Sequence, residues 1–101
     1  MIIKEDAKTI ADAKKSAYIK EKALAYIPAC FNNIREAANN MKYEARVHIE
    51  NVQFIPEIID ELAKVMKEAG YLTTTIGGRN NSRFIYMYWR ELTEDEKKRQ
   101  I

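Results

Sequence analysis

Residues 70–90 read GYLTTTIGGRNNSRFIYMYWR and decide the fold, because two β-type runs flank a polar loop. The first run, Tyr71–Ile76, and the second, Arg83–Trp89, are rich in the β-branched and aromatic residues that strands favour. The intervening GGRNNS contains the glycine and asparagine residues that tight turns use. The pattern therefore predicts a β-hairpin near the end of the chain.

Two further elements precede this hairpin. From Tyr43 to Glu50 apolar and polar residues alternate, which is typical of a strand with one buried side. From about Pro56 to Ala69 apolar residues recur every three or four positions, as they do in an amphipathic helix. Gly70 then supplies the left-handed residue that ends such a helix. We expect the order strand, helix, hairpin.

The first forty residues show a helical repeat. Apolar residues recur every seven positions from Ile3 to Met41, which predicts a long helix with an apolar stripe along one side. Pro28 lacks a backbone N–H and crowds the preceding turn, so we expect either a kink or two helices with Pro28 near the start of the second. The stripe is narrow over residues 1–27, and we expect this part to assemble an oligomer.

Together these elements predict an α+β fold: a long kinked N-terminal helix, a strand, a helix and a β-hairpin. The three strands form an antiparallel-type sheet that helices cover on one face. Residues 1–92 are expected to form a single domain, and residues 93–101 a short tail. Thr93 and Glu96 have the spacing of a capping box, which favours a short helix in this tail.

Composition excludes several classes of protein. A chain of 101 residues makes one domain, and its net charge of +2 argues against an acidic DNA mimic and a strong generic nucleic-acid binder. The only cysteine, Cys30, has no partner for an internal disulfide, and the first residues lack the apolar stretch of a secretion signal. No apolar run approaches the roughly 18 residues that a membrane span needs. We expect a reduced, cytoplasmic protein.

The predicted sheet has a second face, away from the helices. On that face the alternation of the strands places aromatic side chains beside three basic ones: Phe84, Tyr86, Tyr88, Arg90, Arg46 and His48. A face of this composition is too apolar to stay exposed without a role. It fits a sheet-to-sheet contact between copies, a platform on which nucleic-acid bases stack, or a pocket shared between subunits.

The hairpin loop adds groups that suit a phosphate. Gly77 and Gly78 allow positive φ angles and a close approach of backbone N–H groups to a ligand. Arginine holds phosphate through two hydrogen bonds, and asparagine adds neutral ones. The loop candidates are Arg79, Asn80, Asn81 and Arg83. The same residues also suit an ordinary exposed turn, and the loop lacks the Gly-Lys-Ser or Gly-Lys-Thr of a Walker motif.

Groups for catalysis are scarce. Cys30 lies on the apolar side of a helix, where a thiolate is disfavoured, and His48 is expected to be an ordinary exposed residue. Metal ligation lacks a second histidine or cysteine. We therefore expect no enzymatic activity, no bound metal and no cofactor.

A resemblance follows from two stretches, AANNMKYEARVHIE at residues 37–50 and EAGYLTTTIGGRNNSRFIYMYW at residues 68–89. Their order resembles small accessory proteins of tailed bacteriophages, in which a Gly-Tyr strand and a strand ending in Trp close the domain. Among these, the chain looks most like the Thoeris anti-defence sponges. The residue types that match are Arg79, Asn80, Asn81, Arg83, Phe84, Tyr86 and Tyr88.

This resemblance implies a function. Such sponges are small oligomers that bind cyclic nucleotide or ADP-ribose-derived immune signals between subunits without degrading them, in the cytoplasm of the infected bacterium. The residues leave two alternatives open. One is a protein-binding phage factor that inhibits a host or CRISPR enzyme, since interfaces are also rich in aromatic and arginine residues. The other is a small nucleic-acid-binding protein, whose affinity would fall steeply with salt.

Overall fold

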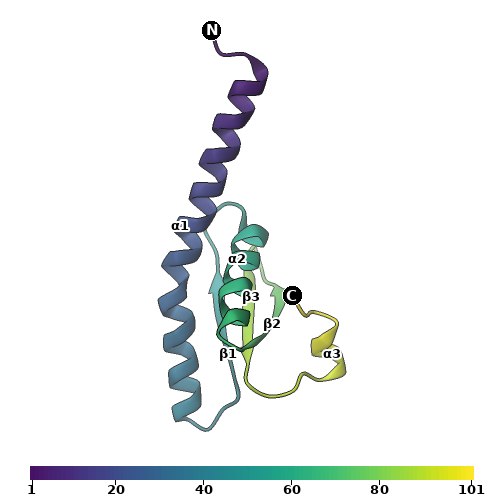
Figure 1. Cartoon of the computed structure of the whole chain (residues 1–101). Helices are drawn as coiled ribbons and strands as arrows, with labels where there is room; N and C mark the ends of the chain where they lie inside the picture. Colours follow the sequence, from purple (N-terminus) through teal and green to yellow (C-terminus); the bar gives the residue numbers. More distant parts are fainter.

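A computed structural model describes all 101 residues and has the predicted α+β architecture (Figure 1). The expected order of a long helix, a strand, a helix and a hairpin is confirmed. The elements are α1 Lys4–Asn39, β1 Glu44–Ile49, α2 Ile55–Glu68, β2 Leu72–Gly77, β3 Arg83–Tyr88 and α3 Glu94–Lys97. None of the helices is both long enough and apolar enough to cross a lipid bilayer.

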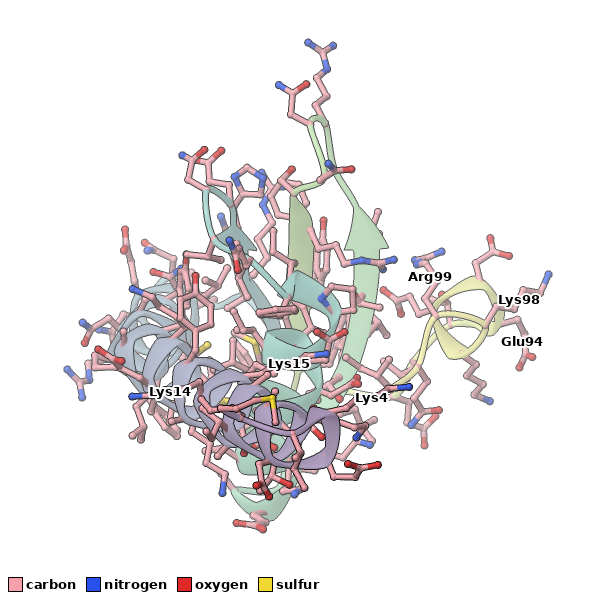
Figure 2. The ribbon with its side chains drawn as sticks, turned by 90° about the horizontal axis from the view of Figure 1, so that it is seen from above. Lys4, Lys14, Lys15, Glu94, Lys98 and Arg99 are labelled. Carbon is pink, nitrogen blue, oxygen red and sulfur yellow. The ribbon has the colours of Figure 1, made fainter.

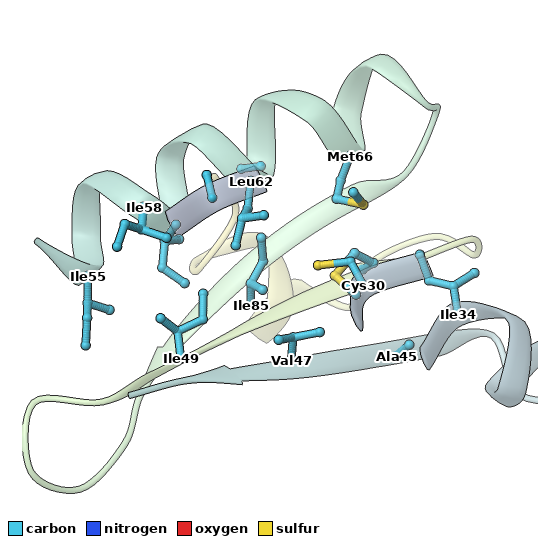
Figure 3. Close-up of a cluster of buried hydrophobic side chains, with 14 residues drawn as sticks. Cys30, Ile34, Ala45, Val47, Ile49, Ile55, Ile58, Leu62, Met66 and Ile85 are labelled. Carbon is cyan, nitrogen blue, oxygen red and sulfur yellow. The ribbon is translucent and has the colours of Figure 1, made fainter. Parts of the chain in front are cut away.

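The sheet is antiparallel, with β3 in the centre and the strand order β1-β3-β2. Its inner face carries Val47 on β1, paired with Ile85 on β3, and both side chains are buried. Helix α2 lies over this face and contributes the apolar residues Ile55, Ile58, Ile59, Leu62, Ala63 and Met66 (Figure 3). The predicted three-stranded sheet with helices on one face is therefore confirmed.

Helix α1 runs without interruption through Pro28, so the alternative of two separate helices is wrong. A proline inside a helix costs about 3 kcal/mol because one hydrogen bond is lost and the ring crowds the preceding turn. Buried residues on both sides of it, Ala23 and Cys30, hold the helix against the core and offset that loss. Figure 1 shows α1 bending gently along its length.

The tail continues the sheet instead of hanging free. Thr93 caps α3 with the predicted capping box, in which its hydroxyl accepts from the Glu96 amide and the Glu96 carboxylate accepts from the Thr93 amide. Beyond α3, Gln100 forms a bridge with Thr74, and the Ile101 amide donates to the Thr73 carbonyl at 3.0 Å. The chain end thus lies along the outer edge of β2.

Candidate functional site

The outer face of the sheet, which is the face away from α2, carries the predicted row of aromatic and basic side chains. The strand register places Arg46 opposite Tyr86 and His48 opposite Phe84. Ile85 and Met87, which alternate with these aromatics on β3, are fully buried on the inner face. The predicted sharing of one face by these β1 and β3 residues is therefore confirmed. We call Arg46, His48, Phe84 and Tyr86 the aromatic-basic patch.

The side chains of this patch are stacked on one another. The rings of His48 and Phe84 are 4.4 Å apart between centroids and inclined by only 20°. The Arg46 guanidinium lies 4.9 Å from the centroid of the Phe84 ring, within the range of a cation–π interaction. Its Nη1 atom donates to the Tyr86 hydroxyl at 3.4 Å. The patch is thus a flat platform that carries a guanidinium.

The charges of the patch are only partly balanced. His48 Nδ1 lies 3.8 Å from a carboxylate oxygen of Glu50. Arg46 makes no ion pair, and its side chain is exposed. A positive charge that rests on aromatic rings without a carboxylate partner is available to an external anion.

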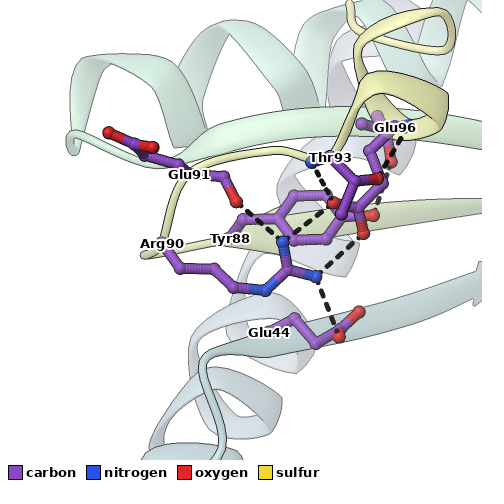
Figure 4. A network of polar contacts seen from close by, with 7 residues as sticks. Glu44, Tyr88, Arg90, Glu91, Thr93 and Glu96 are labelled. Carbon is purple, nitrogen blue, oxygen red and sulfur yellow. Dashed lines mark hydrogen bonds and ion pairs between the residues drawn. The ribbon is translucent and has the colours of Figure 1, made fainter.

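The other end of the outer face is closed. Tyr88 is only 2 % exposed, and its hydroxyl is hydrogen-bonded to the Thr74 hydroxyl at 3.0 Å. Arg90 lies 4.9 Å from the centre of the Tyr88 ring, bonds both carboxylate oxygens of Glu96 at 2.8 Å and reaches Glu44 at 3.2 Å (Figure 4). The predicted ligand residue Tyr88 is therefore covered by protein and lies outside the exposed patch.

These contacts shift the pKa values of Glu96 and Tyr88. The hydrogen bonds from Arg90, together with that from the Thr93 amide, lower the pKa of Glu96 to about 2. Burial raises the pKa of the Tyr88 phenol, although its hydrogen bond with Thr74 acts in the opposite direction. The closed end of the outer face is thus a structural network in which carboxylates balance the charge of Arg90.

The loop between β2 and β3 is a tight turn, but its glycines do not supply the left-handed residues. Asn80 and Asn81 have φ of 55° and 63°, and the Ser82 amide donates to the Arg79 carbonyl at 3.0 Å, as in a type I′ turn. Asparagine tolerates this conformation because its short polar side chain bonds locally. The expectation of positive φ at the two glycines is therefore wrong.

Position 78 requires a glycine because there is no room for a side chain. A Cβ atom there would collide with Ser82 Oγ and lie 3.5 Å from both His48 Nε2 and the Phe84 ring. The Gly78 amide donates to the Ser82 carbonyl at 2.8 Å, so it is used inside the hairpin and does not point to a ligand. Figure 2 shows the hairpin projecting beyond the rest of the molecule.

Two hollows flank the aromatic-basic patch. One, of about 410 Å³, lies between Phe84 and the loop residues Arg79 and Asn80. The other, of about 670 Å³, runs between α1 and β1 beside Arg46 and Tyr86. Five predicted residues thus belong to the patch or line the hollows beside it: Arg46, Arg79, Asn80, Phe84 and Tyr86.

Two predicted residues fall elsewhere. Asn81 and Arg83 line a separate hollow of about 640 Å³ between the hairpin and the start of α2. Arg83 pairs with the buried Ile49 across the strands, and alternation along β3 therefore turns it away from Phe84. His48, which the sequence placed on this face but not among the ligand-binding residues, joins the patch. Its register position opposite Phe84 is the signal that identifies it.

The only thiol of the chain is inaccessible. Cys30 has no exposed surface, and burial raises the pKa of its thiol to about 11, which disfavours a nucleophilic thiolate. No three or more histidine, cysteine, aspartate or glutamate side chains are grouped so that they could hold a metal ion. The aromatic-basic patch combines the exposed Arg46 and His48 with the half-buried rings of Phe84 and Tyr86, and it is the candidate binding site.

The chain matches no protein-family model, no curated protein and no solved structure. The fold and the patch define it as an α+β domain with a basic aromatic platform on the open side of its sheet.

Proposed function

We propose that this protein binds a small phosphate-bearing nucleotide on the aromatic-basic patch and does not transform it. A base stacks on Tyr86, because His48 and Arg46 already lie against the Phe84 ring, and the phosphates bond to Arg46 and Arg79. Asn80 contributes neutral hydrogen bonds from the loop. The two hollows beside the patch have room for the sugar and phosphate groups.

One observation carries the proposal. The guanidinium of Arg46 rests on the Phe84 ring without any carboxylate partner, at 4.9 Å from the ring centre. A flat aromatic surface attracts a base, and an unbalanced guanidinium attracts a phosphate. A nucleotide is a ligand that carries both groups. A long nucleic acid is less well supported, because the patch is short and the net charge of the chain is only +2.

The biological role rests on the resemblance to the Thoeris anti-defence sponges. By that resemblance the ligand is a cyclic nucleotide or ADP-ribose-derived immune signal, which the protein sequesters in the cytoplasm of an infected bacterium. The proposal includes a homo-oligomer.

Native mass spectrometry with a panel of cyclic nucleotides and cyclic ADP-ribose compounds tests the proposal. The variant Arg46→Gln should lower the affinity for the retained nucleotide about 10- to 100-fold, because a charge-assisted hydrogen bond contributes about 1.5–3 kcal/mol. Arg35→Gln is the matched control, since Arg35 is an exposed arginine of α1 without an ion pair. It should bind as the wild type does, and both variants should melt at the wild-type temperature.

Other results would redirect the assignment. If no nucleotide binds while a host protein is captured through the patch, the protein is an inhibitor that acts by protein contact. If the affinity is for single-stranded nucleic acid and falls steeply with salt, the platform is a nucleic-acid site. Equal affinity in Arg46→Gln and wild type would place the nucleotide elsewhere on the molecule.

A further inference from the structure

The N-terminal segment of α1 carries an apolar surface that nothing in the fold covers. Residues 4–17 are all exposed, and this part of the helix projects beyond the sheet and α2 (Figure 1). Five of the eight large exposed hydrophobic residues of the protein lie within residues 1–24. The exposed apolar area is therefore concentrated on one segment, which is typical of an interaction surface.

This surface faces away from the body of the protein. Leu24 is 66 % exposed, whereas its neighbour Ala23 is 5 % exposed and belongs to the core. Residues seven apart lie along one line of a helix, because seven residues make almost two turns. That line, which we call the outer stripe, consists of Ile3, Ile10, Ala17 and Leu24. Helix α1 thus has two apolar sides, and the core uses only one of them.

The opposite side of α1 faces the rest of the protein and makes contacts with it. Lys15 Nζ lies 4.6 Å from the centre of the Phe54 ring, and the Tyr18 hydroxyl accepts a hydrogen bond from the Gln53 amide at 3.1 Å. In Figure 2, which looks at the molecule from its N-terminal end, Lys15 lies on the side of α2 and Lys14 on the opposite side. The contacts to the body leave the outer stripe free along its whole length.

The charges along this segment are unevenly divided. Residues 1–12 contain two lysines and three acidic residues, a side-chain charge of −1. Residues 13–24 contain four lysines and one acidic residue, and their side-chain charge is +1 without Lys15 and Lys22, which lie over the rings of Phe54 and Tyr18. Parallel pairing of two copies would place the two positive halves side by side. Antiparallel pairing places each positive half against the negative half of the partner.

We propose that a second copy of this chain covers the outer stripe, as an antiparallel pair of helices over residues 3–24. The paired segment is about 32 Å long at 1.5 Å per residue. A two-fold axis passes near Ala13, and each surface is its own complement. The outer stripe and the open sheet face are different surfaces, so the pairing does not rest on the proposed nucleotide binding.

Sedimentation equilibrium over a concentration series tests whether the outer stripe forms a dimer contact. The wild type should approach twice the chain mass of 11.8 kDa. Ile10→Lys should remain a monomer, because it places a charge in the apolar contact. Ala11→Lys, which changes the adjacent exposed residue on a different side of α1, should still form the dimer. A wild type that stays monomeric, or an Ile10→Lys variant that still dimerises, would overturn the proposal.

Cysteine cross-linking tests the orientation, and Cys30 does not interfere because it is fully buried. In an antiparallel pair Ala13→Cys oxidises to a disulfide-linked dimer, since this residue lies beside its own copy. Leu24→Cys alone does not cross-link, but a mixture of Ile3→Cys and Leu24→Cys gives the mixed dimer. A parallel pair would reverse this result: Leu24→Cys would cross-link with itself and the mixture would give no mixed product.

Discussion

Two guanidiniums lie on the outer face of the sheet, each 4.9 Å from the centre of an aromatic ring, but they have different surroundings. Arg90 covers Tyr88 and is neutralised by Glu96 and Glu44. Arg46 covers Phe84 and has no acidic partner. The first arrangement closes one end of the face, and the second leaves the other end charged and open. The comparison shows that charge neutralisation, more than the aromatic residue itself, separates a structural cluster from a binding surface.

The closed end combines a near and a remote part of the chain. Glu96 lies six residues after Arg90, whereas Glu44 at the start of β1 lies 46 residues before it. At the open end no acidic side chain pairs with Arg46. Tyr86 and Tyr88 are two residues apart on one strand and their rings are 6.1 Å apart, yet only Tyr88 is fully buried.

The largest effect on stability is expected when the closed end loses its buried hydrogen bond. Tyr88→Phe removes the partner of the Thr74 hydroxyl, which has no exposed surface. An unsatisfied buried hydroxyl costs about 1–3 kcal/mol, so the free energy of unfolding in urea should fall by that amount.

The double variant Thr74→Val/Tyr88→Phe is the control for this prediction. It removes both polar partners from the same site, and it should recover part of the lost stability because no buried hydroxyl remains without a partner. A double variant that is less stable than Tyr88→Phe would mean that packing, and not hydrogen bonding, holds the closed end.

A smaller effect on stability, with a defined pH dependence, is expected when Glu96 is replaced. Its folded pKa of about 2 lies below the ordinary value of 4.5, so the carboxylate stabilises the fold above pH 4.5 and this contribution is lost as the pH falls toward 2. Glu96→Gln should therefore melt at a lower temperature than the wild type at neutral pH. The difference should shrink as the pH falls from about 4.5 to about 2.

Glu94→Gln is the matched variant, because Glu94 lies in the same short helix and bonds only Lys97, at 3.3 Å. Its melting temperature should stay close to that of the wild type at neutral pH. If Glu94→Gln and Glu96→Gln behave alike, the network around Arg90 does not stabilise the closed end.

The local parts of this fold could be predicted from the sequence, because their signals lie within a few residues. The alternation of residues 43–50, the helical spacing after Pro56 and the capping box at Thr93 each correspond to an observed element. The same alternation places Arg83 on the inner side of β3, and applying it to the whole strand would have separated this residue from Phe84.

The remaining features depend on contacts that sequence spacing does not reveal. The continuity of α1 through Pro28 requires packing on both sides of the proline. The burial of Tyr88 requires Arg90, whose partner Glu44 lies 46 residues away along the chain. The left-handed residues of the loop are Asn80 and Asn81, whereas composition favoured the glycines. Gly78 instead makes a close contact with Ser82.

The smallest effect on stability is expected at the open end, where Tyr86→Phe is the counterpart of Tyr88→Phe. The Tyr86 hydroxyl accepts one long hydrogen bond, of 3.4 Å, from the exposed Arg46, and water can replace it. The free energy of unfolding in urea should therefore change by no more than about 0.5 kcal/mol. A loss as large as that in Tyr88→Phe would mean that the aromatic-basic patch is a structural cluster like the closed end. A negligible loss, together with weaker nucleotide binding in Arg46→Gln, would separate the two ends as the difference in their charges predicts.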